Sequence, residues 1–221
     1  MPQVFSPRSD RRLRLALSIG AAMLLLILAV GFAYARSGAA WAVGKPAAQP
    51  IPFSHAVHAG GLGLDCRFCH AGVEQAAAAG MPTAETCLGC HSRVWTVTPQ
   101  FAPLATALAR GTPVEWSSVH RLPDHVRFHH AAHVRSGVTC QTCHGPVWEM
   151  PRTVKTETLS MGWCLDCHRD PASRQGPADQ ALARDPAGGP PPDRPFGLAA
   201  RPVMHQGIEV SPLTRCSTCH R

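Results

Sequence analysis

The stretch Cys140-Gln141-Thr142-Cys143-His144 decides how this chain folds, because its pattern occurs five times in 221 residues. The other copies begin at Cys66, Cys87, Cys164 and Cys216, and the five copies together contain all ten cysteines. Each copy has two cysteines three residues apart and a histidine directly after the second. On a helix, residues i, i+3 and i+4 share one face. The two thiols and the imidazole therefore point in the same direction.

This Cys-x-x-Cys-His pattern is the attachment motif of c-type haem. The thiols form thioethers with the porphyrin, and the histidine binds the iron from one side. A lone Cys-x-x-Cys also occurs in redox dithiols and zinc sites. Five copies that use every cysteine argue against both, so we expect five covalently attached c-type haems. The attachment cysteines are Cys66, Cys69, Cys87, Cys90, Cys140, Cys143, Cys164, Cys167, Cys216 and Cys219, and the proximal histidines are His70, His91, His144, His168 and His220.

The composition is unsuited to an ordinary globular core. Aromatic residues make up 6% of the chain, which also contains 19 glycines and 21 prolines. The 171 residues from 51 to 221, shared among five haems, leave about 34 residues for each. We therefore expect the haems to pack on one another and to supply much of the apolar core. The predicted fold class is a multihaem cytochrome c of short α-helices and irregular coil, with one N-terminal transmembrane helix.

The net charge of +7 raises nucleic acid or an anionic membrane surface as possible partners. Each haem brings two propionates, and their negative charge offsets much of this basic excess. We therefore expect no nucleic-acid partner.

The N-terminal segment predicts a membrane anchor. Residues 15–35 carry no charge, and as a helix they span about 30 Å, the thickness of the hydrocarbon core. Four arginines precede them, so the positive-inside rule places residues 1–14 in the cytoplasm and the haem domain on the periplasmic side of a bacterial inner membrane. Ala33-Tyr34-Ala35 resembles a signal-peptide cleavage site, but the run is longer than an h-region of about 7–15 residues. We expect a retained single anchor.

A repeat divides the rest of the chain. The pattern Phe-x-His-x-x-His begins at Phe53 and again at Phe128, before the first and the second pair of motifs, which suggests a duplicated dihaem unit. The predicted segments are a basic cytoplasmic tail (1–14), a transmembrane helix (15–35), a linker (36–52), a tetrahaem domain of two dihaem units (53–170), a Pro-rich arm (171–202) and a fifth-haem segment (203–221).

Eight histidines lie outside the motifs. Two histidines at i and i+3 on a short helix can reach two irons, so both repeats can supply distal ligands. Met161, three residues before Cys164, is a rival ligand that would raise a haem potential, although a methionine beside Trp163 also suits packing. The candidate sixth ligands are His55, His58, His120, His130, His133 and Met161, whereas His125, His129 and His205 are expected to face solvent or propionates.

These features resemble the pentahaem, membrane-anchored cytochrome c subunit of alternative complex III, a respiratory quinol:acceptor oxidoreductase. The Phe-x-His-x-x-His pattern is less specific, because class III multihaem cytochromes share it. The family's usual acid or asparagine is His129 here, which leaves open whether His129 or His130 binds iron. The resemblance covers nearly all of the chain after Pro50. It rests on Phe53-Ser54-His55, Val119-His120-Arg121-Leu122-Pro123-Asp124, Leu159-Ser160-Met161-Gly162-Trp163-Cys164 and Cys216-Ser217-Thr218-Cys219-His220-Arg221.

The resemblance implies an electron-transfer subunit that passes electrons along five haems toward a periplasmic cytochrome or a terminal oxidase. It implies as partners an iron–sulfur and molybdopterin-enzyme-like subunit, quinol-binding integral membrane subunits and a monohaem cytochrome c. We expect the chain not to be catalytic alone. The alternatives are a self-sufficient membrane-anchored multihaem quinol dehydrogenase and a reductase with one five-coordinate haem, which the surplus of histidines disfavours.

Overall fold

The computed structural model describes residues 6–96, 99–176, 180–182, 204–205, 208–209 and 213–220. The chain forms two compact units, Met1–Ala42 and Val43–Arg221. Most of the Pro-rich arm predicted at residues 171–202 lies outside the described residues, as do the first five residues of the predicted basic tail.

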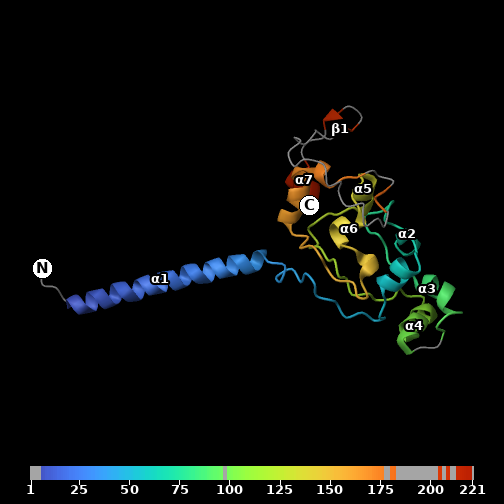
Figure 1. Cartoon of the computed structure of the whole chain (residues 1–221), viewed down its shortest axis with the longest axis horizontal. Coiled ribbons are helices and arrows are strands. Elements are labelled where there is room, and N and C mark those ends of the chain that lie inside the picture. The colour runs from blue at the N-terminus through green and yellow to red at the C-terminus, as the bar shows by residue number, and fades with distance from the viewer. Residues whose placement is uncertain are drawn as a thin grey trace. The chain divides into compact units, whose positions relative to one another are not determined.

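The first unit contains one long helix, α1 (Pro7–Arg36), drawn in blue in Figure 1. Ser6 caps it by accepting a hydrogen bond from the Ser9 amide, and Pro7 at its first position has a backbone dihedral suited to a helix start. Large apolar side chains are exposed along its length, for example Leu25 at 67%. In the described part of the chain, α1 is the one helix long and apolar enough to cross a membrane.

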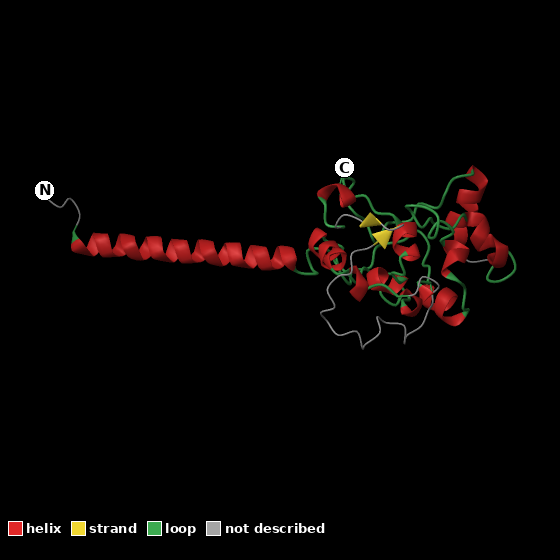
Figure 2. Ribbon diagram, turned by 90° about the horizontal axis from the view of Figure 1, so that it is seen from above, coloured by secondary structure: helices red, strands yellow, loops and turns green. Residues whose placement is uncertain are grey.

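The second unit consists of short helices joined by irregular coil (Figure 2). Its two short strands pair in antiparallel fashion. Its elements are η1 (Ala56–Gly61), α2 (Cys66–Cys69), α3 (Ala84–His91), η2 (Pro99–Phe101), α4 (Ala102–Arg110), α5 (His130–Arg135), α6 (Cys140–His144), η3 (Val147–Glu149), α7 (Met161–Arg169), η4 (Pro171–Ser173), β1 (Met204–His205), β2 (Ile208–Glu209) and α8 (Cys216–Cys219).

Five of these helices, α2, α3, α6, α7 and α8, carry the Cys-x-x-Cys-His motifs. Three of them begin with a side-chain cap that satisfies a free backbone amide of the first turn. Asp65 accepts from the amide of Arg67, Thr83 caps α3, and Ser160 accepts from the amide of Trp163. The residues before these motifs therefore help to set where the motif helices start.

The apolar core of the second unit is small. Helices α3 and α4 lie side by side (Figure 1), and Leu104 of α4, only 2% exposed, packs with Ala84 and Ala107 in one cluster of five buried residues. A second cluster contains Val73 and Val134. Buried apolar area is the main source of folding free energy, so a core this small suits a fold in which cofactors supply further apolar volume.

A close backbone crossing generates the first prediction. Gly137 has a φ of +79° and accepts a hydrogen bond from the Gly176 amide, and a Cβ at position 137 would meet the Gly176 carbonyl oxygen. Gly111 at the end of α4 has a similar φ of +62° but open space around it. Both alanine variants incur a left-handed backbone cost of about 1–2 kcal/mol, and Gly137→Ala adds an overlap cost of about 1–3 kcal/mol.

We therefore expect Gly137→Ala to lower the apparent melting temperature of the haem-loaded protein by more than Gly111→Ala does. Circular dichroism and the Soret band during heating would measure both variants. An equal decrease in melting temperature for the two variants would contradict the close backbone approach between residues 137 and 176.

Candidate functional site

Each motif histidine faces one histidine from outside the motifs. Two of these pairs use the histidines of η1 and its preceding residue, and two use the histidines of α5. We number the sites by motif order along the chain. Ring centres are separated by 6.5 Å at site 1 (His55 and His70), 6.1 Å at site 2 (His58 and His91), 6.3 Å at site 3 (His130 and His144), 6.1 Å at site 4 (His133 and His168) and 5.5 Å at site 5 (His125 and His220).

These separations can be compared with the requirement of a metal bound on both sides. A metal–imidazole bond is about 2 Å long, and a ring nitrogen lies about 1 Å from its ring centre, so two imidazoles on one iron have centres about 6 Å apart. Sites 1 to 4 fall at 6.1–6.5 Å. The residues present therefore fit a haem iron with two axial histidines.

Hydrogen bonds orient most of these rings. A backbone carbonyl can only accept, so a ring nitrogen bonded to one must carry the proton, which leaves Nε2 free for a metal. The Nδ1 bonds to carbonyl oxygens are His58 to Ser54 (2.9 Å), His70 to Gly80 (2.7 Å), His91 to Val94 (3.1 Å), His130 to Ala77 (2.8 Å), His133 to His129 (2.9 Å) and His168 to Leu213 (2.9 Å).

The two Phe-x-His-x-x-His segments have the same side-chain geometry. Phe53 lies 4.4 Å from His58 at an interplanar angle of 28°, and 4.9 Å from His55 at 88°. Phe128 lies 4.5 Å from the ring of His133 at 27°. It also lies 4.8 Å from that of His130 at 89°. In both copies the phenyl ring stacks on one imidazole and meets the other edge-on, so it fixes the divergence of the two rings.

Burial keeps two of the site histidines, His144 and His55, neutral. Burial, followed by His120 and His130, lowers the pKa of His144 to about 3. Burial and the neighbouring His70 lower the pKa of His55 to about 4. Metal binding requires the neutral imidazole, so these side chains are in their ligating form at neutral pH.

The motif thiols are also held in the neutral form. Burial and the thiols of Cys167 and Cys164 raise the pKa of Cys143 to about 12. A hydrogen bond with the Cys66 thiol, followed by burial, raises the pKa of Cys140. Catalytic dithiols have lowered pKa values, so these cysteines do not resemble a redox dithiol.

The same thiols show which motifs are neighbours. Cys66 of the first motif contacts Cys140 of the third, and Cys143 lies near the fourth motif. Burial and the nearby Cys87 raise the pKa of Cys69, and burial and Cys219 raise that of Cys164. The first motif is therefore adjacent to the second and third, and the fourth is adjacent to the third and fifth.

Three buried side-chain atoms have no hydrogen-bond partner in the described part of the chain: Trp116 Nε1, His120 Nε2 and Thr156 Oγ1. An unsatisfied buried polar group costs about 1–3 kcal/mol. A haem propionate is an acceptor that could satisfy such a group, so these atoms also fit a bound haem.

His120 differs from the other predicted ligands. Its ring centre lies 4.3 Å from that of His144 at 77°, closer than a shared iron allows, and His130 already faces His144. The structure therefore places His120 beside site 3, where His144 already has His130 as its opposed histidine. Met161 is 64% exposed at the start of α7.

His125 is the site residue that local sequence patterns did not reveal. A bridge between Val126 and His220 and a 2.7 Å hydrogen bond from the Arg127 amide to the Cys219 carbonyl bring it opposite His220. These contacts are long-range, and no local spacing signals them. His129 is exposed, and the side chain of His205 lies outside the described residues.

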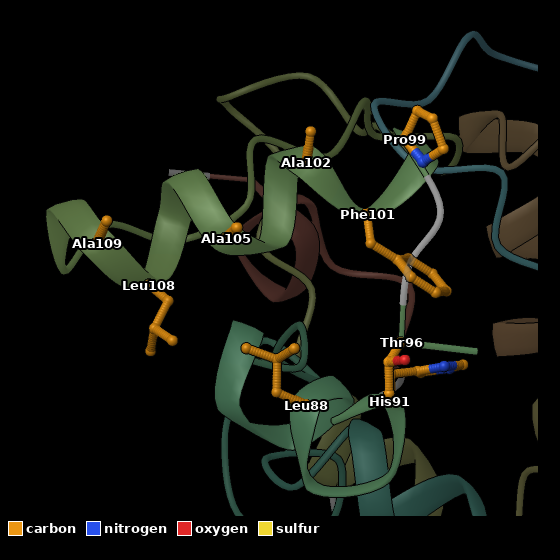
Figure 3. Close-up of a pocket in the computed structure, with 9 residues that line it drawn as sticks. All are labelled: Leu88, His91, Thr96, Pro99, Phe101, Ala102, Ala105, Leu108 and Ala109. Carbon is orange, nitrogen blue, oxygen red and sulfur yellow. The ribbon is translucent and has the colours of Figure 1, made fainter. Parts of the chain in front are cut away.

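An apolar pocket of about 680 Å³ lies beside His91, between α3 and α4. Leu108 of α4 points toward Leu88 of α3 (Figure 3). The ring of Phe101 lies 4.6 Å from that of His91. The motif histidine of site 2 therefore has apolar surroundings on this side.

Comparison with known proteins agrees with this geometry. Residues 126–221, which hold three of the five motifs, match the family of cytochrome c7 and related cytochrome c. The fold class is that of a multihaem cytochrome c. This confirms the predicted class of short helices and coil with an N-terminal apolar helix, and it implies several covalently bound c-type haems.

A relative in Nitratidesulfovibrio vulgaris, the multihaem cytochrome c subunit of a menaquinone reductase, is 40% identical over 97 residues. The match covers 43% of this chain and 45% of that protein. This multihaem chain therefore spans less than half the length of the curated relative it matches.

The paired histidines generate the second prediction. Replacing His55, His58, His130 or His133 with alanine should convert one low-spin haem to a high-spin or water-bound form, because one axial bond is lost. Low-temperature electron paramagnetic resonance would measure the change. His129→Ala, directly beside His130, is the matched control and should keep every low-spin signal. A variant with an unchanged set of low-spin signals would remove that residue from the ligands.

The third prediction compares two histidines five residues apart. His125→Ala should remove one low-spin signal, that of site 5. His120→Ala should keep the number of low-spin signals and perturb only site 3, because its ring contacts His144. The same resonance measurement decides between them. If His120→Ala removed a low-spin signal and His125→Ala did not, His120 and not His125 would be an iron ligand.

Proposed function

We propose that this chain is the electron-transfer subunit of a membrane respiratory quinol:acceptor oxidoreductase. The observation that supports this most strongly is the set of five opposed histidine pairs, four of which have the separation of an iron bound on both sides. An iron with two protein ligands offers no position to a substrate. Electron transfer is therefore the chemistry that these sites favour over reaction with a small molecule.

The chain would hold five covalently attached c-type haems, which supply one-electron redox chemistry when bound. The ten motif cysteines would form the thioethers, and the ten paired histidines would bind the irons. The chain's own contribution is to keep the imidazoles of His55 and His144 neutral by burial and to fix the orientation of most of the rings through Nδ1–H. A fixed ligand geometry keeps reorganisation small when the charge of a site changes.

Contacts between the sites support a single row in the order 2, 1, 3, 4, 5. Sites 1 and 2 share the segment around η1, and sites 3 and 4 share α5. Sites 1 and 3 meet where the Cys66 and Cys140 thiols touch, and His168 of site 4 donates to the Leu213 carbonyl just before the fifth motif. Sites 2 and 5 would then be the two ends at which electrons enter and leave.

The comparisons support a quinone-linked membrane complex, because the relative's name describes a subunit of a menaquinone reductase. The resemblance to alternative complex III extends this to an iron–sulfur and molybdopterin-enzyme-like subunit, quinol-binding integral membrane subunits and a monohaem cytochrome c as partners. That resemblance also supplies the direction, quinol oxidation. Quinone reduction is the second candidate, favoured by the relative. Purifying the native complex in mild detergent, identifying its subunits and measuring both reactions would decide between them.

We further propose that α1 is a retained anchor in a bacterial inner membrane, with the haem sites on the periplasmic side. Its exposed leucines and the arginines at its N-terminal end support this orientation. We predict that membrane-extracted protein begins upstream of residue 15. N-terminal sequencing that finds a mature chain starting at Arg36 would instead assign α1 to a cleaved signal peptide.

The last prediction of this proposal concerns catalysis by the isolated chain. Quinol oxidation releases protons and needs a base near the membrane, yet residues 15–35 contain no acid, base or histidine. The haem-loaded chain alone should be reduced by dithionite but should turn over no quinol, whereas the complex in mild detergent should. Steady quinol:cytochrome c turnover by the isolated chain would establish the self-sufficient dehydrogenase.

A further inference from the structure

Within Val43–Arg221, the predicted dihaem units contain motifs one and two and motifs three and four. The histidine-bearing segment of each dihaem unit docks on the coil that follows the first motif of the other dihaem unit. In one direction, the amide and Nδ1 of His130 both donate to the Ala77 carbonyl, at 3.0 and 2.8 Å, and the amide of Ala131 donates to the Ala76 carbonyl. In the other direction, the amide of Ala56 donates to the Met150 carbonyl at 3.0 Å. Sites 1 and 3 therefore lie at a junction that both units build.

The two halves of this junction differ in the group that the distal histidine meets through Nδ1. His130 Nδ1 meets a backbone carbonyl, whereas His55 Nδ1 meets the side-chain hydroxyl of Thr153 at 2.9 Å. The five other Nδ1 bonds described for site histidines also end on backbone carbonyls. A carbonyl only accepts, but a hydroxyl can donate or accept. The proton on the His55 ring is therefore controlled by a side chain that a single substitution can change.

The ring geometry is nearly the same at sites 1 and 3. The planes at site 1 lie 13° apart with centres 6.5 Å apart, and those at site 3 lie 9° apart with centres 6.3 Å apart. Hydrogen bonding to the second nitrogen fixes the tautomer of a ligating histidine and raises its basicity. The partner at Nδ1 is therefore a difference between the distal imidazoles His55 and His130 that would affect the iron.

We propose that Thr153 is a positioning residue for site 1. Its hydroxyl accepts the Nδ1 proton of His55, turns Nε2 toward His70 and sets the redox potential of that site. The inference rests on the proposed sharing of one iron by His55 and His70. Because Thr153 lies between the third and fourth motifs, in the second dihaem unit, site 1 is complete only when the two dihaem units have docked.

Removal of the hydroxyl has a definite sign. Without an acceptor at Nδ1, the imidazole of His55 becomes a weaker electron donor, and the ferric state of site 1 is stabilised less. The midpoint potential of site 1 therefore rises. The two axial ligands stay in place, so the number of low-spin signals does not change.

The experiment uses the full, haem-loaded chain with Thr153→Val, Thr153→Ala and Thr153→Ser. Redox titrations followed by visible absorption and paramagnetic resonance measure the potential of each site. One potential should shift upward in the valine and alanine variants, and serine should restore the original value. Thr106→Val is the control, because Thr106 is exposed on α4 and its hydroxyl bonds only the Ala102 carbonyl.

Unchanged potentials in the valine and alanine variants would overturn the proposal, and so would an equal shift in the serine variant. Should Thr153→Val assemble poorly, the alanine and serine variants still make the comparison, because both remove the methyl group but only serine keeps the hydroxyl. The variant His55→Ala distinguishes the role of Thr153 from the proposal on which it rests, that His55 and His70 share one iron. If His55→Ala leaves all low-spin signals, the shared iron is wrong. If His55→Ala removes one low-spin signal while Thr153→Val leaves every midpoint potential unchanged, only the proposed role of Thr153 is wrong.

Discussion

The separation of about 6 Å that one metal imposes on two opposed imidazoles is the constraint on which the second unit depends. Each motif supplies one ring locally, on its own short helix, and the second ring must arrive from elsewhere in the chain. At site 5 the partners are His125 and His220, which a backbone bridge brings together. In the described residues the buried side chains form small clusters, so closure of these pairs and attachment of the cofactors must contribute much of the folding free energy.

The sequence predicted those features whose residues lie close together along the chain. The five motif helices could be placed because their pattern fits within one helical turn. The histidines around η1 and on α5 could be proposed as distal ligands because the two histidines of each segment are three residues apart, although the motif histidine opposite each of them could not be assigned. His125 could not be found in this way, because its position opposite His220 depends on a contact between residues 126 and 220. The helix predicted at residues 15–35 extends to Pro7, because Ser6 caps it and arginine is a good helix former. Hydropathy alone does not report such a polar end.

The duplication explains why the two units need each other. A dihaem segment of this size leaves the amides at the start of its histidine helix unsatisfied. The coil after the other unit's first motif satisfies them, at Ala76 and Ala77 on one side and at Met150 on the other. This reciprocal docking brings Cys66 and Cys140 into contact. The same hydrogen bonds that complete the helix starts therefore join the two halves of the proposed row of sites.

The proposed row of irons, each bound on both sides, would conduct electrons in either direction. Nothing at such a site distinguishes quinol oxidation from quinone reduction, since the ligands neither take up substrate nor bind the protons released. Direction must come from the potentials of the sites and from the partners at the two ends. The chain can adjust those potentials through burial, neighbouring charges and the acceptor at each Nδ1. Under the proposed function, a relative described as a menaquinone reductase subunit and a chain resembling a subunit of a quinol:acceptor oxidoreductase can belong to one class of cytochrome. Their difference would lie in contacts such as that of Thr153, which tune a site without altering its ligands.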